Sequence, residues 1–416
     1  VFWGFLVILI GSIEMIIDGL FGTERVLAVL GGFYKFIMAS GDIFALIIAV
    51  AILIFLFRRV FLHVKRFSGI EMKHISHMDA NLALTMILLL MLSLLGLNTF
   101  YLHDAPAHGH VVVGLYPVSQ FLAGIIDAGE ANYFWHQFNW WFHIGLVFVF
   151  ANYLPYSKHF HVFMSVPNVF LSRLEPLGKV DTMESITKEV KIMMDPDQAF
   201  ASPPEGAEAE EEAPERFGIL DVEDVSWKNY FDSLACTECG RCTSVCPANL
   251  TGKMLSPRKI VMDVRARMKE KGPGLVKNGK EYSDERALIR DYVSEEELWA
   301  CTLCNACAQE CPININHPSL IVGMRRYLVM EESAAPGELN AIFSNIENNG
   351  APWQFSPEDR MLWADGKVEV PLMADMLAKG EKPEYLLWVG SAGAFDDRYK
   401  QVSTAFAKVL NHLGIS

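Results

Sequence analysis

Apolar and polar positions divide the chain into two contrasting parts. Before about residue 155 the apolar residues form long runs, whereas beyond about residue 180 the sequence is polar and charged. Four runs approach the length of about 20 residues that a membrane-spanning helix needs, the second only with its flanking residues. They cover Phe2–Ile17, Ile43–Phe57, Leu82–Phe100 and Tyr133–Leu154. Soluble core helices rarely provide four such runs in so short a stretch, so the pattern predicts a transmembrane helix bundle.

The basic residues between these runs predict the orientation of the bundle. Five of them lie between the second and third runs, and none occurs from Tyr101 to Asn132. The positive-inside rule therefore places residues 58–79, and everything after residue 155, in the cytoplasm. The net charge of −14 comes mostly from the polar part. It argues against nucleic acid as a partner, because nucleic acid requires a basic surface.

All eight cysteines of the chain fall into two copies of one motif. The segment CTECGRCTSVCP supplies Cys236, Cys239, Cys242 and Cys246, and CTLCNACAQECP supplies Cys301, Cys304, Cys307 and Cys311. The spacing C-x₂-C-x₂-C-x₃-C-P is that of bacterial ferredoxins with two 4Fe–4S clusters, in which the fourth cysteine of each run ligates the other cluster. We therefore expect Cys311 to complete the cluster of the first motif, and Cys246 to complete that of the second.

Two other uses of these cysteines fit the sequence less well. Disulfides require an oxidising compartment, and this part of the chain is expected in the cytoplasm. Zinc sites use pairs of C-x₂-C, whereas each motif here is a triplet followed by C-P, with no cysteine left over. Iron–sulfur clusters therefore remain the preferred interpretation.

The remaining polar part predicts helices and a tether. The segment SPRKIVMDVRARMKEKG, between the motifs, starts with a serine cap and a proline at the first helical position, which favours an α-helical ferredoxin. Residues 195–218 are rich in Pro, Ala and Glu and predict a solvated linker. In the tail, Tyr385–Gly390 is typical of a buried strand, and Asp396–Gly414 of an amphipathic helix that ends at glycine.

These patterns predict a mainly α fold: a transmembrane helix bundle, an α-helical two-cluster ferredoxin domain and a C-terminal α/β fragment. The expected parts are a transmembrane domain (1–155), a cytoplasmic connector (156–194), an acidic linker (195–218), the ferredoxin domain (219–335) and a tail (336–416). Since Val1 lies inside an apolar run, we also expect the natural polypeptide to continue beyond the numbered residues.

Histidines in the fourth run raise the question of a further cofactor. His143 and His161 are 18 residues apart in WWFHIGLVFVFANYLPYSKHFH, so in one continuous helix they share a face about 27 Å apart. Pro155 lies between them and can kink that helix. Two such imidazoles near opposite membrane surfaces suit two stacked b haems. His159 points nearly the other way and is expected to be dispensable.

His63 and His74, 11 residues apart on the cytoplasmic side, also share a helical face and are alternative haem ligands. The competing interpretation for every one of these histidines is a hydrogen-bonded or interfacial imidazole without iron. For His103, His108 and His110 that interpretation is preferred.

The fourth run resembles the last helix of the gamma subunit of respiratory nitrate reductase. In that family two histidines flanking a Pro-aromatic-Ser-basic stretch each bind one haem b, and His143 and His161 match them. Their partner histidines lie on an earlier helix, yet the first run here has none. Either the partners precede Val1, or residues such as His63 or His74 serve, or one haem is missing.

The cysteine part resembles the iron–sulfur subunits of heterodisulfide reductase, glycolate oxidase and succinate dehydrogenase. In heterodisulfide-reductase-like proteins, cysteine-rich CCG domains follow the ferredoxin, so the resemblance implies that residues 336–416 are a tail and the start of such a domain. A cysteine commonly stands in that family where Ser391 is here. No cysteine follows Cys311, so a CCG active site is expected to be absent or to lie on another chain.

Together, the two halves are similar to membrane-bound oxidoreductases that join a nitrate-reductase-gamma-like domain to a heterodisulfide-reductase-like module. That resemblance implies electron transfer between a cytoplasmic donor, such as an electron-transfer flavoprotein, and menaquinone in a bacterial or archaeal cytoplasmic membrane. The implied cofactors are two 4Fe–4S clusters, one or two b haems and menaquinone. Membrane lipid, the quinone and a partner protein with CCG domains are the further partners. The alternatives are a component of a quinol-linked disulfide reductase and a structural component of a larger respiratory complex.

Overall fold

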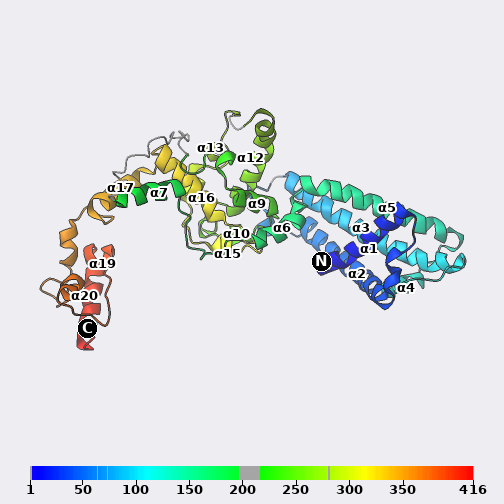
Figure 1. The fold of residues 1–416 in the computed structure, drawn as a ribbon, viewed down its shortest axis with the longest axis horizontal. Helices are drawn as coiled ribbons and strands as arrows, with labels where there is room; N and C mark the ends of the chain where they lie inside the picture. The colour runs from blue at the N-terminus through cyan, green and yellow to red at the C-terminus, as the bar shows by residue number, and fades with distance from the viewer. Residues whose placement is uncertain (1, 63, 73, 196–215, 280–281, 416) are drawn as a thin grey trace, which may run out of the picture. The chain divides into compact units, whose positions relative to one another are not determined.

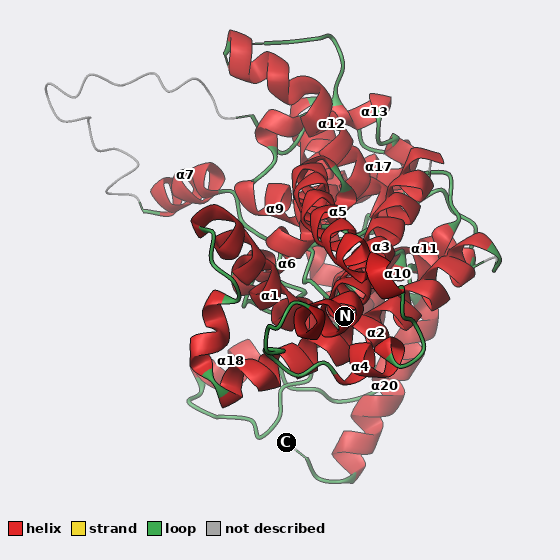
Figure 2. Ribbon diagram, turned by 90° about the vertical axis from the view of Figure 1, so that its right-hand side faces the viewer, coloured by secondary structure: helices red, strands yellow, loops and turns green. Residues whose placement is uncertain are grey.

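The described part of the protein is mainly helical. The structure is a computed structural model that describes residues 2–415 except 63, 73, 196–215 and 280–281. Every regular element of the described part is a helix, and no strand occurs there (Figure 2). The chain divides into two compact units, Val1–Tyr327 and Leu328–Ser416. The prediction of a mainly α fold is therefore confirmed.

The first unit begins with long helices that pack side by side (Figure 1). They are α1 (Phe2–Phe21), α2 (Gly32–Val60), α3 (His74–Ala107), the short α4 (Pro117–Ala123) and α5 (Asn132–Tyr153). The first three contain segments long and apolar enough to cross a membrane, namely Trp3–Phe21, Gly32–Val60 and Ser76–Ala107. These segments include nearly all of the first three predicted runs, which indicates a membrane protein.

The fourth predicted run corresponds to α5. This helix has 22 residues, enough to span a bilayer at about 1.5 Å per residue. Its first half carries Asn, Gln and His among the aromatic residues, and it is not among the helices selected by apolar composition. Because α5 packs chiefly against α3, its position in the membrane stays a prediction that this packing favours.

Small residues allow the bundle helices to approach closely. Ala45 and Ala49 of α2 are buried against Leu90, Met91 and Leu95 of α3. Between α3 and α5, a Cβ on Gly96 would lie only 2.7 Å from the side-chain oxygen of Asn139. Such contacts are typical of membrane helices, which associate by close packing rather than by the hydrophobic effect.

Helix α5 ends at Tyr153 and does not continue to His161. Two 3₁₀ turns, Leu154–Tyr156 and Lys158–Phe160, separate α5 from α6 (His161–Phe170). Ser157 between them is extended, and its hydroxyl accepts a hydrogen bond from the backbone N–H of His159 at 3.1 Å. His143 and His161 therefore lie on separate helices, and the distance of about 27 Å that assumed one continuous helix does not apply.

The cysteine-containing part of the first unit consists of short helices around one longer helix. In order after α6 they are α7 (Glu184–Met194), α9 (Trp227–Ala235), α10 (Arg241–Ser244), α11 (Pro247–Leu250), α12 (Pro257–Asn278), α13 (Leu288–Asp291), α14 (Glu295–Trp299), α15 (Ala306–Gln309) and α16 (His317–Arg326). Ser256 caps α12 and Pro257 is its first residue, as the sequence predicted. Most of the predicted acidic linker lies outside the described residues.

The described residues of the second unit form four α-helices, and one prediction is corrected there. They are α17 (Gly337–Asn349), α18 (Met373–Ala378), α19 (Ser391–Phe395) and α20 (Asp397–His412). The predicted amphipathic helix is confirmed as α20, but Tyr385–Gly390 is not a strand. Leu387 and Val389 pack on the small core around Trp363, while the side chain of Trp388 is 84% exposed. The strand prediction is wrong because no neighbouring strand in the described part supplies backbone partners.

Candidate functional site

The two cysteine loops have the same backbone path. Glu238 and Leu303 occupy the same position of the motif and both have positive φ, 58° and 53°. Two residues further on, Gly240 and Asn305 have φ of 75° and 60° and precede the short helices α10 and α15. At Gly240 a Cβ would lie 2.4 Å from the carbonyl oxygen of Arg66, so only glycine fits. The repeated motif thus folds into two equivalent thiol-presenting loops.

The thiols around the first loop are electrostatic neighbours. Burial, with a smaller contribution from a charge on Cys311, raises the pKa of Cys236 to about 11. Burial also raises the pKa of Cys242, with additional contributions from Cys236, Cys239 and Cys311. The pKa of Cys311 is raised by burial and by Cys239. Cys311, from the second motif, is thus close to all three cysteines of the first loop.

The second loop has the reciprocal arrangement. Burial, together with charges on Cys301, Cys246 and Cys304, raises the pKa of Cys307 to about 12. The pKa of Cys301 is also raised by burial, then by Cys246 and Cys304. Cys246, from the first motif, is therefore a neighbour of the second loop. Cys304 is the exposed member of the set.

This donor set suits clusters better than single ions. All eight cysteines are free thiols. In the part of the chain that the structure describes, no three His, Cys, Asp or Glu side chains converge closely enough to hold one metal ion. A cubane is ligated by four thiolates, one for each iron, so its cysteines surround it instead of meeting at a point. The loops therefore fit 4Fe–4S clusters, which the thiolates would hold and which would supply one-electron redox chemistry.

The first cysteine loop is fixed to the loop between α2 and α3 by a buried ion pair. Arg258 of α12 donates to Glu71 at 2.7 Å and to the carbonyl oxygen of Arg66 at 2.7 Å. The two side chains of the pair are only 1% and 4% exposed. Burial alone would raise the pKa of Glu71, but hydrogen bonds from Ser256 and Arg258 and the charge of Arg258 hold it below its usual value. The carboxylate thus stays ionised at the junction.

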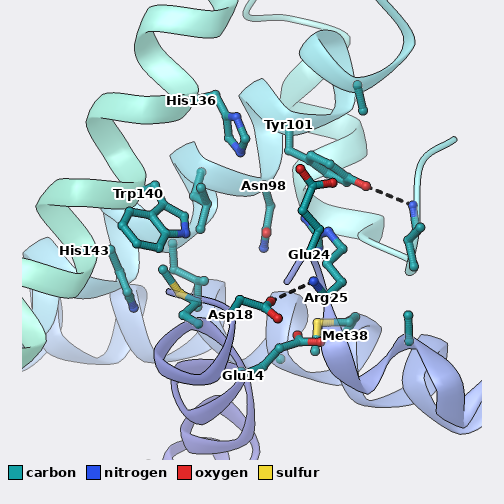
Figure 3. Close-up of a pocket in the computed structure, with 18 of the residues that line it drawn as sticks. Glu14, Asp18, Glu24, Arg25, Met38, Asn98, Tyr101, His136, Trp140 and His143 are labelled. Carbon is teal, nitrogen blue, oxygen red and sulfur yellow. Dashed lines mark hydrogen bonds between the residues drawn. The ribbon is translucent and has the colours of Figure 1, made fainter. Parts of the chain in front are cut away.

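His143 lies inside the helix bundle beside a cavity of about 850 Å³ (Figure 3). Its side chain is 2% exposed, and its Nδ1 is 3.1 Å from the carbonyl oxygen of Leu90 and 2.9 Å from the hydroxyl of Ser93. Because that hydroxyl donates to the same carbonyl, Nδ1 is assigned the hydrogen, and Nε2 keeps its lone pair. Metal-binding histidines typically have their second nitrogen held in this way. The environment of His143 therefore suits the role of a haem ligand.

His161 begins α6 and is held similarly. Its Nδ1 is 3.1 Å from the carbonyl oxygen of Lys158, which again leaves Nε2 with a lone pair. Burial lowers the pKa of His161. Burial, followed by the charge of His161, lowers that of His159 to about 4. Both imidazoles are thus neutral near pH 7, the form that binds iron. Their ring centroids are 5.7 Å apart, and the buried Nε2 of His159 has no hydrogen-bond partner among the described residues.

The other predicted haem ligands are not placed. His63 lies outside the described residues, and His74 begins α3 but its side chain is not described. The role of both therefore stays a prediction.

The polar residues on the other side of the cavity were not anticipated. Glu14 of α1 accepts from the hydroxyl of Tyr34 at 3.1 Å, and Asp18 accepts from the backbone N–H of Arg25 at 2.7 Å. His136 also lines the cavity, opposite these groups in Figure 3. A signal was available, since an acidic residue inside an apolar run marks a functional position by default. Glu14 lies in the first predicted run.

Comparison with known proteins identifies relatives of both halves. Residues 235–315 match the family model for a 4Fe–4S dicluster domain. The whole chain is 31% identical to the probable iron-sulfur-binding oxidoreductase FadF of Bacillus subtilis and covers 58% of that protein. Over 69% of the chain it is 33% identical to the EtfAB:quinone oxidoreductase of Syntrophomonas wolfei, covering 39% of it.

A third relative is a component of the dihydromethanophenazine:CoB–CoM heterodisulfide reductase of Methanosarcina barkeri. It is 25% identical over 47% of the chain and 46% of that component. The chain thus spans less than two thirds of the length of these curated relatives. No solved structure matches it.

Proposed function

We propose that this chain, which is similar to iron–sulfur oxidoreductases and to a heterodisulfide reductase component, carries electrons between a cytoplasmic donor and the quinone pool. The observation that carries the proposal is that one compact unit contains both the pair of equivalent cysteine loops and helices long and apolar enough to span a membrane. Soluble electron carriers need no such anchor, and membrane anchors need no such loops. The combination serves transfer at the membrane surface.

Each cluster has its own proposed ligand set. Cys236, Cys239, Cys242 and Cys311 hold the first cluster, and Cys301, Cys304, Cys307 and Cys246 hold the second. The electrostatic proximity of Cys311 to the first loop and of Cys246 to the second supports this exchange of fourth ligands. The same exchange is typical of two-cluster ferredoxins.

Within the bundle, His143 and His161 are the proposed axial ligands of b haem. The held Nδ1 of each and the cavity beside His143 support this assignment. A volume of about 850 Å³ lies within the range of roughly 300–1,000 Å³ usual for ligand pockets. When bound, haem iron supplies one-electron exchange inside the bilayer. His63 and His74 remain the alternative or partner ligands.

The proposed acceptor is a quinone, menaquinone in the first instance, and the proposed donor is an electron-transfer flavoprotein. Similarity to a protein named EtfAB:quinone oxidoreductase supports both assignments. The exposure of Cys304 at the second loop supports access by a soluble donor. We place the cysteine loops on the cytoplasmic side of a bacterial or archaeal membrane, as the distribution of basic residues favours.

A second candidate is favoured by the similarity to the heterodisulfide reductase component: the chain would pass electrons from quinol to a disulfide-reducing partner. Both functions are tested with the chain purified in detergent and reconstituted with clusters. We expect it to catalyse reduction of a menaquinone analogue by reduced electron-transfer flavoprotein, and Cys304→Ser to abolish this activity. Absence of quinone reduction by a cluster-replete protein, together with quinol-dependent disulfide reduction when a partner protein with CCG domains is added, would favour the second candidate.

A further inference from the structure

The two cysteine loops differ in one buried charged residue, Glu238, since Arg241 of the first loop and Glu310 of the second are exposed. In each loop an arginine donates to the carbonyl oxygen of the first cysteine: Arg265 to Cys236 at 3.0 Å, and Arg325 to Cys301 at 2.5 Å. The residue two positions after that cysteine is a glutamate in the first loop and a leucine in the second. The backbone is left-handed at both positions. At this position of the motif, only the first loop therefore carries a carboxylate, that of Glu238.

Glu238 is buried between two cations and joins three parts of the chain. Its carboxylate forms ion pairs with Lys158 at 3.0 Å and with Arg265 of α12. It also accepts a hydrogen bond from the hydroxyl of Ser76 in α3. Glu238 is 7% exposed and Lys158 is 8% exposed. A buried carboxylate that lost these partners would be strongly unfavourable, so the contacts fix the position of the loop.

The same lysine connects the first loop to the segment that carries His159 and His161. Lys158 Nζ donates to the carbonyl oxygen of Ser76 at 2.6 Å as well as to Glu238. Its own carbonyl oxygen is 3.1 Å from Nδ1 of His161. Lys158 thus contacts Glu238 through its side chain and a proposed haem ligand through its backbone. The first loop, and not the second, is attached to the bundle by this chain of contacts.

We propose that Glu238 is a positioning residue that docks the first cysteine loop on the turn around Lys158 and lowers the reduction potential of the group held there. This proposal rests on the proposed function, because it assumes that the loop holds a cluster. The physical reason is charge. An electron arriving at the first loop adds a negative charge next to a buried carboxylate, whereas Lys158 and Arg265 favour that charge. Glu238 offsets the two cations, and at the second loop Leu303 supplies no such charge.

The test compares charge-neutral substitutions at equivalent positions in the reconstituted full chain. The two cluster potentials are measured by redox titration followed by electron paramagnetic resonance. Glu238→Gln keeps the shape of the side chain and removes its charge. We expect it to shift the reduction equilibrium of one cluster on the order of tenfold, which raises that midpoint potential by about 59 mV for one electron. Leu303→Gln, the matched control in the second loop, should leave both potentials unchanged.

Lys158→Met provides an independent measurement with the opposite sign. Loss of that cation should lower the same potential that Glu238→Gln raises. If Glu238→Gln does not retain its clusters, the change of midpoint potential in Lys158→Met alone tests the proposal. Unchanged potentials in both variants at full iron content, or an equal shift in Leu303→Gln, would overturn the proposal. A wild-type chain that binds no clusters would refute the proposed function instead, so the two failures are distinguishable.

Discussion

A histidine is prepared for iron when one ring nitrogen is held by an acceptor and the ring is neutral. His143 and His161 meet the first condition through the carbonyl oxygens of Leu90 and Lys158. His161 also meets the second, because burial lowers its pKa. His159 is equally neutral, but its Nδ1 lacks such a backbone acceptor in the described hydrogen bonds, and its Nε2 is buried without a partner. These differences make the three histidines separable by experiment.

We predict that His143→Ala and His161→Ala each lose one low-spin b haem signal, whereas His159→Ala keeps both. An unliganded imidazole would otherwise bury polar nitrogens at a cost of about 1–3 kcal/mol. The measurement is a reduced-minus-oxidised optical spectrum of membranes containing each variant. Full haem content in His161→Ala, combined with loss in His159→Ala, would identify His159 as the ligand instead.

We predict that Cys311→Ser damages the cluster of the first loop and spares that of the second. Cys311 interacts electrostatically with Cys236, Cys239 and Cys242 even though it belongs to the second motif. Iron and sulfide analysis of the wild-type chain should give about eight of each, as two 4Fe–4S clusters require. Cys246→Ser is the matched variant and should show the reverse pattern by electron paramagnetic resonance. Damage confined to the second cluster in Cys311→Ser would show that the fourth ligands are not exchanged.

At this scale the sequence was informative where chemistry imposes a fixed spacing. The tight C-x₂-C-x₂-C run brings three thiolates to one cubane, and the structure keeps both runs as equivalent loops. The partners of Glu238 could not be predicted, because Lys158 and Ser76 are distant from it in sequence. Such contacts depend on tertiary packing and leave no local pattern.

Among the secondary-structure elements, the sequence predicted helices better than their ends. The apolar run Ile43–Phe57 identified α2, but the helix begins at Gly32, because polar or aromatic residues do not end a helix unless the backbone requires it. Pro155 was recognised as a source of a kink, yet the two 3₁₀ turns also depend on Asp79, which accepts from the Ser157 hydroxyl at 2.6 Å. The segment Tyr385–Gly390 is a continuous apolar run but has no pairing partner in the described part, so apolar character alone misidentified it as a strand.

The junction between the loop after α2 and helix α12 leads to a prediction about pH. Glu71 has a pKa below its usual value in the folded protein, so its contribution to stability is present above about pH 4.5, near its unfolded value. That contribution is lost as the pH falls through the lower, folded pKa. Glu71→Gln should destabilise the protein by about 3 kcal/mol at neutral pH, because Arg258 then keeps a buried charge without its partner.

The measurement is thermal unfolding of the purified protein in detergent between pH 7 and about pH 3. The difference between the wild type and Glu71→Gln should shrink as the pH falls. Glu358→Gln, which changes an exposed carboxylate of the second unit, serves as the control and should leave the transition of the first unit unchanged. A difference that is constant over the whole range would show that the Glu71 charge does not stabilise the junction.

For the whole molecule, the charge distribution leads to a prediction about sidedness. The acidic segment of residues 195–218 contains Glu208 and Glu210–Glu212 and is expected on the cytoplasmic side with the cysteine loops. A glutamyl endopeptidase should therefore cut this segment in inverted membrane vesicles and not in right-side-out vesicles. The integrity of the right-side-out vesicles is checked with a periplasmic marker. Cleavage from the outside only would reverse the proposed orientation.

The buried pair of Arg258 and Glu71 also bears on how this protein can be recombined. The cysteine-containing part appears in the sequence as a separate module after an acidic linker, yet one of its arginines is paired with a residue that precedes α3. A chimera that exchanges only the residues after the linker would leave one charge of the pair facing a foreign surface. The transferable unit is therefore the ferredoxin part together with residues 65–71 and with Ser76 and Lys158, the partners of Glu238. A transplant that moves all of these should assemble where a transplant of the ferredoxin part alone fails.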